Sequence, residues 1–457
     1  MTTLRRLFLA AVSCGAIATA FAVPSVAAEK APLDANGAPC VDGKLDGALQ
    51  CIPNSVATST AERPYRHAGA SDGRLTGRIG KGFQRRSRQL VYAAVPGSIV
   101  VFDVVRDPAT RGPAWRFVKR ITFEEPPAPL FAESISAMMA SPATNMVYVS
   151  TRGHLIAIDL LTEKVVWKNA YEPGTCCERG AVTPDGKTLV VGSDLKNFHY
   201  VLDATTGAVK GKIPTPKSMF NHNMNLSADG KLDFAAPNGI TMTIADVEAM
   251  KPIKTITFSD HVRVFVINHD ASRVYANLNN LLGFEIADVK TGKVVKRIEA
   301  PGEMWKAKWA DPNLQFYGHG APHHGIAMLP DEREIWIPDS INDQVLVFDN
   351  TGEWPVLNMA KTIKSNGQPN GWITFGLDGK YAYMASGEVV DVATHKIVGY
   401  MKDEFGRWMD SEKVLDMAFD ENGKLIRTVN QFSQGDPKAV AARIAAEKTR
   451  TNQPANR

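Results

Sequence analysis

A set of mostly charged or titratable residues occupies one constant place in a repeated sequence pattern. Each lies seven residues before the tight turn that follows an apolar segment. In chain order they are Ser136, Glu178, His222, Arg263, His324, Gly371 and Lys413. Histidine and carboxylate groups transfer protons near neutral pH, whereas Arg and Lys bind carboxylates and stabilise developing negative charge. The candidate catalytic set is therefore Glu178, His222, Arg263, His324 and Lys413.

Flanking positions add groups able to contact a ligand. They are Cys177, Arg179, Asn221, Asn223, His261, His323, Asn370, Trp372 and Glu412. A convergent arrangement would bind a small anion, or would serve a lyase or hydrolase acting on an acidic sugar or lactone. In a metal-dependent oxidoreductase, His222, His324 and Glu178 would instead hold a divalent or copper ion. The remaining alternative is a wet channel whose polar lining has no further role.

Established catalytic motifs are absent from the sequence. It contains no Gly-x-Ser-x-Gly elbow, no His-Glu-x-x-His, no Cys-x-x-Cys-His haem site and no phosphate loop. We therefore rank binding of a small anionic ligand or a protein partner ahead of catalysis. The sequence identifies no cofactor.

The repeated pattern that positions these residues has a period typical of a β-propeller. Its turns are anchored at positions 143, 185, 229, 270, 331, 378 and 420, so successive steps are 42, 44, 41, 61, 47 and 42 residues. Apolar runs with period-2 character separate the turns, and Asp, Asn and Gly occupy the positions that hairpins require. A step of 40–45 residues with four short strands predicts one blade of an all-β propeller.

The two ends of the repeat region indicate how the ring closes. Residues 89–123 resemble the second, third and fourth strands of a blade, and residues 413–419 resemble a first strand. A blade shared between the two ends would leave no free sheet edge. We expect a propeller over residues 89–432 with seven four-stranded antiparallel blades, and eight blades is the alternative.

The repeats resemble those of the bacterial YVTN-repeat (YncE-like) seven-bladed propellers. The resemblance rests on segments such as Thr183-Pro-Asp-Gly-Lys-Thr-Leu-Val-Val191 and Leu377-Asp-Gly-Lys-Tyr-Ala-Tyr383. That superfamily includes the propeller domains of nitrous oxide reductase and of quinoprotein amine dehydrogenase heavy chains. This chain has too few histidines on its strands for the copper cluster of the former, and it encodes no tryptophan-derived cofactor subunit. The resemblance therefore implies architecture and not activity.

The longest step contains an insertion at residues 301–322. It precedes the strand that carries His323 and His324, so we expect it to cover the same channel mouth. Trp305 and His319 within it are candidate ligand-binding residues. The alternative is a loop that packs its aromatic side chains against a blade.

The N-terminal residues 1–28 are typical of a secretory signal peptide. Arg5 and Arg6 precede an apolar run, and small residues follow at the cleavage position. The paired arginines also resemble a twin-arginine signal, and both export routes remain open. We expect a periplasmic or secreted protein with an irregular strap at residues 29–88. The tail at residues 433–457 should be polar and helical over 438–448.

Charge and cysteine content limit the partners. Removing Arg5 and Arg6 with the signal peptide lowers the net charge from +4 to +2, and no basic stripe indicates a nucleic-acid partner. No later apolar run would span a membrane, and we expect a monomer.

Cys40 and Cys51 are expected to form a disulfide in an oxidising compartment. The adjacent Cys176 and Cys177 could form a vicinal disulfide, remain thiols or bind a metal.

Overall fold

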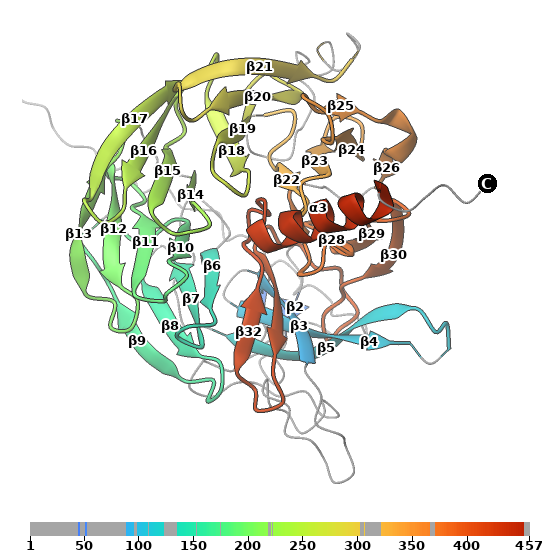
Figure 1. The fold of residues 1–457 in the computed structure, drawn as a ribbon. Coiled ribbons are helices and arrows are strands. Elements are labelled where there is room, and N and C mark those ends of the chain that lie inside the picture. Colours follow the sequence, from blue (N-terminus) through green and yellow to red (C-terminus); the bar gives the residue numbers. More distant parts are fainter. Residues whose placement is uncertain are drawn as a thin grey trace, which may run out of the picture.

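The protein is a seven-bladed β-propeller, as the ring of sheets in Figure 1 shows. The computed structural model describes residues 44–45, 51–52, 88–95, 98–107, 109–122, 135–151, 153–173, 175–217, 221, 223–301, 306, 321–365 and 371–451. The predicted fold class is confirmed, and the eight-bladed alternative is wrong. A two-stranded sheet of β1 (Lys44–Leu45) and β2 (Cys51–Ile52) lies outside the ring count.

Six blades consist of consecutive antiparallel strands, ordered from the channel outward. The first blade consists of β6 (Ile135–Ser141), β7 (Met146–Thr151), β8 (Leu155–Asp159) and β9 (Val165–Asn169). The second consists of β10 (Gly180–Val182), β11 (Thr188–Gly192), β12 (Phe198–Asp203) and β13 (Val209–Pro214). The third consists of β14 (Asn223–Leu226), β15 (Leu232–Ala236), β16 (Thr241–Asp246) and β17 (Lys251–Thr257). The fourth blade consists of β18 (Val262–Ile267), β19 (Arg273–Leu278), β20 (Gly283–Asp288) and β21 (Lys293–Glu299). The fifth consists of β22 (Ala327–Met328), β23 (Glu334–Asp339), β24 (Gln344–Asp349), β25 (Val356–Leu357), the 3₁₀ helix η1 (Met359–Lys361) and β26 (Ile363–Lys364). The sixth consists of β27 (Ile373–Phe375), β28 (Tyr381–Met384), β29 (Glu388–Asp391) and β30 (Lys396–Tyr400).

The seventh blade joins the two ends of the repeat region, as the sequence predicts. The C-terminal strand β31 (Val414–Phe419) pairs antiparallel with β3 (Arg88–Val95), and β4 (Ser98–Arg106) and β5 (Pro113–Thr122) continue the sheet. Because both faces of the inner strands pack against neighbouring blades, β3 reads as a nearly continuous apolar run. The ring thus closes through hydrogen bonds between segments more than 300 residues apart, such as the bonds from Gln89 to Asp416.

The repeated Asp-Gly pairs of the sequence are turn residues. Gly186 and Gly230 have φ angles of +70° and +74°, a left-handed conformation that favours glycine. The Asp185 carboxylate accepts a hydrogen bond from the Lys187 backbone N–H at 3.0 Å. The sequence period that predicts the fold therefore arises because the same residue types are needed at the turn of each blade.

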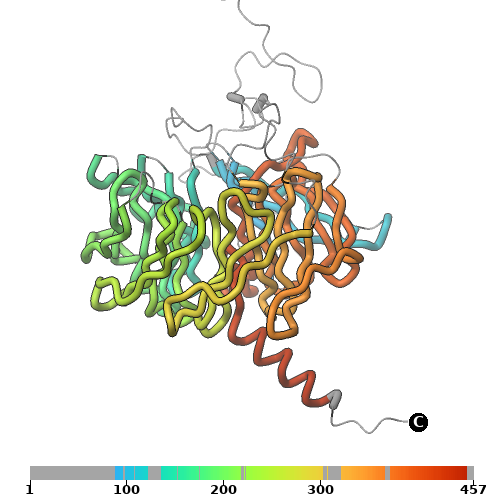
Figure 2. Tube along the Cα trace, turned by 90° about the horizontal axis from the view of Figure 1, so that it is seen from above, coloured from blue at the N-terminus to red at the C-terminus, as the bar shows by residue number. Residues whose placement is uncertain are grey.

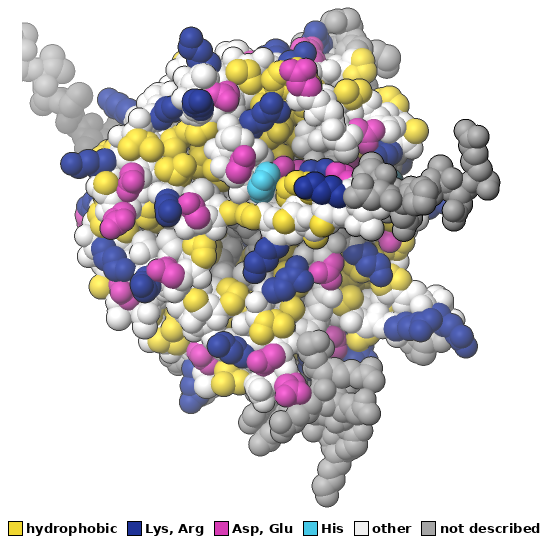
Figure 3. Space-filling view, in the orientation of Figure 1, with side chains coloured by type: hydrophobic (Ala, Val, Ile, Leu, Met, Phe, Trp, Pro, Cys, Tyr) yellow, Lys and Arg dark blue, Asp and Glu magenta, His cyan; other side chains and the backbone are white. Residues whose placement is uncertain are grey.

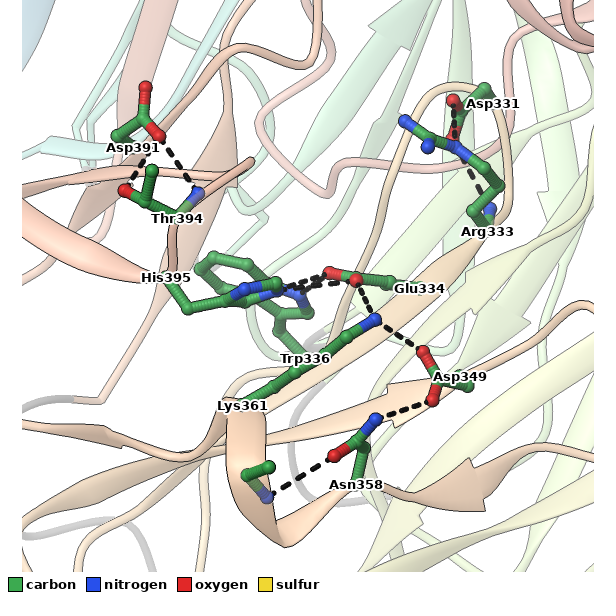
Figure 4. A network of polar contacts seen from close by, with 11 residues as sticks. Asp331, Arg333, Glu334, Trp336, Asp349, Asn358, Lys361, Asp391, Thr394 and His395 are labelled. Atoms are coloured by element: carbon green, nitrogen blue, oxygen red, sulfur yellow. Dashed lines mark hydrogen bonds and ion pairs between the residues drawn. The ribbon is translucent and has the colours of Figure 1, made fainter.

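Buried polar contacts join neighbouring blades in addition to the apolar cores. The pairs are Lys119–Glu163, His199–Asp233, Glu334–His395 and Tyr383–Asp416. In Figure 4, Glu334 also receives hydrogen bonds from Trp336 and Lys361, at 2.8 and 2.7 Å. A charge taken from water needs several such partners to be tolerated. These contacts set the positions of the blades relative to one another.

The C-terminal segment fills the central channel. After β31 the chain forms an additional strand, β32 (Leu425–Thr428), on the channel side of the closing blade. Residues 430–436, which we term the plug, then bond to the inner strands of five blades. The bonds include those from Met138 N–H to the Gln431 side chain, from Gln434 to Leu226 O, from Gly435 N–H to Ile267 O, from Met328 N–H to Ser433 O and from Phe375 N–H to the Ser433 hydroxyl. A segment with partners on five blades lies in the channel.

The helix α3 (Pro437–Thr451) follows the plug and leaves the ring on one face (Figure 2). The Asp436 N–H, just before it, donates to Pro330 O at 2.8 Å, so α3 begins on the face where β22 ends. In the described part of the chain, no helix has the length and hydropathy needed to cross a membrane.

Candidate anion site at the mouth of the channel

The described members of the predicted set lie where the inner strands begin, at the channel mouth opposite α3. Glu178 and Arg179 precede β10, His324 precedes β22, and Glu412 and Lys413 precede β31. All five are at most 5% exposed. Ser136 on β6, Arg263 on β18 and Gly371 before β27 complete the described positions of the ring. His222, Trp305, His319 and Asn370 lie outside the described residues.

Arg179 is at the centre of this group. Its guanidinium carbon lies 4.4 Å from the Trp372 ring centroid and 5.5 Å from that of Phe432 in the plug. Cation–π contacts of this kind hold a guanidinium against aromatic faces and leave its N–H groups at the edge. The Nε and Nη1 atoms of Arg179 are buried and have no hydrogen-bond partner among the described residues. A buried cation with unpartnered donors is unfavourable unless an acceptor binds there.

Glu412 links three nitrogen-bearing side chains at the mouth. Its carboxylate lies 3.2 Å from His324 Nδ1, 3.5 Å from Lys413 Nζ and 3.9 Å from Arg179 Nη2. The His324 ring is also 5.5 Å from the Trp372 ring, so it packs on the same indole as the guanidinium. We term this group the mouth cluster. Glu412 faces the two permanent cations of Arg179 and Lys413, and Glu178 is a second buried carboxylate at the same mouth. The donors of Arg179 at Nε and Nη1 that have no partner among the described residues are the groups able to bind a further acceptor.

Arg263 and His261, two further residues of the predicted site, make contacts outside the mouth cluster. Arg263 Nε donates to Asn279 Oδ1 at 2.6 Å, and burial lowers the pKa of Arg263. His261 is 53% exposed and pairs with its neighbour Asp260. No hydrogen bond or ion pair joins either residue to the mouth cluster in the part of the chain that the structure describes.

His323 packs into the fold beside the mouth cluster. Its side chain is fully buried, with Nε2 2.6 Å from Gly283 O and Nδ1 3.0 Å from Gly325 O. Burial lowers the pKa of His323, which favours the neutral ring. The two adjacent histidines thus have different environments, because His324 meets a carboxylate and His323 meets backbone carbonyls.

Cys176 and Cys177 are joined in a vicinal disulfide directly before Glu178 and Arg179. Both are buried, and the Cys177 N–H donates to Thr151 O at 3.0 Å. The Glu178 N–H in turn donates to Gly192 O at 2.8 Å. These bonds fix the backbone that carries Arg179. The predicted Cys40–Cys51 disulfide lies outside the described side chains.

Residues of the plug also line the mouth, although they lie outside the repeated sequence pattern. Phe432 contacts both Arg179 and Trp372, and the Gln431 carbonyl accepts a hydrogen bond from Trp372 Nε1 at 2.9 Å. The segment after Phe419 has no periodic pattern that would indicate a return into the channel. The only signal in it is the apolar Phe432 between polar neighbours.

Metal binding has no support from the described side chains. Among them, no group of three or more His, Cys, Asp or Glu residues is placed to hold a metal ion. The predicted set of His222, His324 and Glu178 includes a residue outside the described part of the chain.

Comparisons with known proteins add little. No family model matches the chain, and no curated protein matches it. A chain of hydrazine synthase from Kuenenia stuttgartiensis is similar in structure over 58% of this chain and 94% of that one, with 17% identity and a TM-score of 0.38. The fold and the mouth cluster define the protein as a β-propeller with a filled channel, an architecture that serves as a scaffold for binding ligands or proteins.

Proposed function

We propose that this protein is an exported binding protein that holds a small carboxylate-bearing anion at the channel mouth. One observation carries the proposal: the buried Arg179 guanidinium has unpartnered donors at Nε and Nη1. Arg is suited to this task because its rigid fork of N–H groups matches the oxygens of a carboxylate. The plug supports binding at the mouth over passage through the ring, because it occupies the channel behind the mouth cluster.

The setting and family of the protein are part of the same proposal. The N-terminal sequence pattern supports export to the periplasm or medium, and the repeat segments support membership of the YVTN-repeat propellers. Detection of the mature chain in the periplasmic fraction, beginning near Glu29, tests the first point. A chain retained in the cytoplasm with its N-terminus intact would contradict it.

The binding test compares wild type with Arg179→Met by isothermal titration calorimetry, with D-galacturonate as the probe. Methionine keeps an unbranched apolar stem against Trp372 but removes the charge and every donor. Loss of charged hydrogen bonds of about 1.5–3 kcal/mol should weaken binding at least about tenfold. The control is Arg297→Gln on the outer strand β21, which should leave affinity within about twofold.

A stability measurement separates a binding role from a structural one. The unpartnered donors of the buried guanidinium cost free energy, whereas its contact with Glu412 stabilises the fold. These effects oppose each other, so Arg179→Met should unfold at a temperature close to that of wild type. Galacturonate binding that is absent in wild type, or lost only together with a lower melting temperature, would overturn the proposal. Arg179→Lys should retain part of the affinity because it keeps the charge without the fork.

A second function is favoured by one distance, the 3.2 Å between His324 Nδ1 and Glu412 Oε1. A histidine beside a carboxylate can act as a general base or acid, and Arg179 beside it would hold an acidic substrate. A lyase or hydrolase would turn over uronate oligomers or sugar lactones, with activity lost in His324→Gln. Binding without turnover across such substrates would leave the binding function alone.

A further inference from the structure

We propose a second ligand site, a pocket for small amphiphilic anions at the seam where the ring closes. The pocket has a volume of about 470 Å³, within the range of small-molecule sites. Its walls come from the closing blade and from the neighbouring blade of β27–β30. The site lies by the turn between β27 and β28, on the face opposite the mouth cluster, so it is independent of the function proposed above.

The pocket exists because the β4–β5 hairpin is longer than its counterparts. The two strands have 9 and 10 residues, whereas the other outer strands have 7 or fewer. The hairpin therefore projects beyond the ring, as Figure 1 shows. Val104, Val105 and Pro113 near its end form one wall, and Leu377 and Tyr381 of the neighbouring blade form the other.

Trp115 fixes the hairpin to the neighbouring blade. Its ring packs edge-on to Tyr381 at 5.1 Å between centroids, and its Nε1 lies 3.4 Å from the Tyr383 hydroxyl. On β30 the chain has Gly399, where an added Cβ would lie 2.4 Å from the Trp115 ring. Since the walls are held by packed aromatic groups, the pocket is formed without a ligand, which lowers the cost of binding.

The rim of the pocket is cationic. Arg106, Arg111 and Lys380 line it, and none of them forms an ion pair with a described residue. Figure 3 shows Lys and Arg side chains over the projecting end of the hairpin. Asp378 at the same rim is already paired with Arg427 at 3.1 Å. Three cations that form no ion pair with described residues, beside a concave apolar wall, favour an anion over a cation or a neutral ligand.

The floor of the pocket is formed by the buried Asp416. Its side chain accepts hydrogen bonds from Gln89 Nε2, at 2.9 and 2.7 Å, and from the Leu377 N–H at 3.1 Å. Burial outweighs these hydrogen bonds and raises the pKa of Asp416 to about 6, so this carboxyl group loses its negative charge below about pH 6. The ligand meets the cationic rim and the apolar walls. The ligand class is a phosphate, sulfate or carboxylate joined to an aromatic or short apolar group.

Phenyl phosphate is the probe, titrated into the full chain by isothermal titration calorimetry. Inorganic phosphate carries only the anionic group and benzyl alcohol only the aromatic group. Each should therefore bind at least about tenfold more weakly than phenyl phosphate. Arg111→Gln/Lys380→Gln removes two rim charges that make no hydrogen bond to described side chains, and it should weaken phenyl phosphate at least about tenfold. The matched control is Arg116→Gln/Lys396→Gln, which removes two exposed charges from the same two blades outside the pocket.

The outcomes decide the proposal. Tenfold loss in the rim variant, an affinity within about twofold in the control, and unchanged binding in Arg179→Met would establish a separate seam site. No binding of phenyl phosphate by wild type, or equal losses in the rim variant and the control, would overturn it. The four side chains substituted in the rim and control variants are exposed, so both variants should have the melting temperature of wild type.

Discussion

The hydrogen bonds that Glu334 accepts from three donors make part of the unfolding free energy of this propeller dependent on pH. Burial raises the pKa of Glu334, but hydrogen bonds from His395, Lys361 and Trp336 outweigh it and lower the pKa from 4.5 to about 2. At 1.36 kcal/mol for each tenfold change, this difference corresponds to about 3 kcal/mol. Solvent screening at the partly open Lys361 reduces the contribution to about 1–3 kcal/mol.

The sign follows from the direction of the shift. A carboxylate whose pKa is lower in the folded protein stabilises it above the unfolded value of 4.5, and this stabilisation is lost as pH falls towards 2. Glu334→Gln removes the charge at every pH. The difference in unfolding free energy between wild type and this variant should be about 1–3 kcal/mol at pH 6 and should shrink as pH falls from 5 to 2.

The assay is urea unfolding followed by circular dichroism at a series of pH values. Acidic groups distant from Glu334 titrate equally in both proteins, so they cancel in the difference. The exposed Glu353 in the same blade provides the control, and Glu353→Gln should change the unfolding free energy by less than about 0.5 kcal/mol. A difference between wild type and Glu334→Gln that stays constant from pH 6 to pH 2.5 would refute the reasoning.

Two other substitutions test the packing that closes the ring. Phe432→Ala leaves a cavity in the plug against Trp372, so it should lower the unfolding free energy by about 3–5 kcal/mol, and a loss below 1 kcal/mol would show that the plug is not packed there. Gly399→Val places a side chain against the Trp115 ring, so chemical unfolding should show a loss of about 1–3 kcal/mol, whereas Val398→Ala beside it should cost less than about 1 kcal/mol; equal losses would contradict the contact.

The architecture was predictable because each blade repeats the same turn chemistry. Asp185-Gly186 and Asp378-Gly379 mark hairpins through local hydrogen bonds and positive φ angles, which depend on adjacent residues only. The plug could not be predicted in the same way. Its contacts join residues as distant as Met138 and Gln431, 293 positions apart, and no local pattern encodes such a contact.

The candidate site was predictable in place but not in detail. The register located the channel mouth, yet Arg179 and Glu412 are neighbours of the positions that it selected, Glu178 and Lys413. A shift of one residue reverses the side of a strand, so a register read from turns leaves this choice open. The different environments of His323 and His324 depend on contacts with Gly283 and Glu412, which are distant in sequence.

The most direct test of the account is a crystal structure of the mature protein grown with D-galacturonate. If Arg179 binds the anion, density for the sugar should lie at the mouth, with carboxylate oxygens about 2.7–2.9 Å from Arg179 Nε or Nη1 and with the plug still in the channel. Density for the sugar elsewhere, or an Arg179 whose Nε and Nη1 both bond to groups of the protein, would contradict the claim that this guanidinium is kept for an anion.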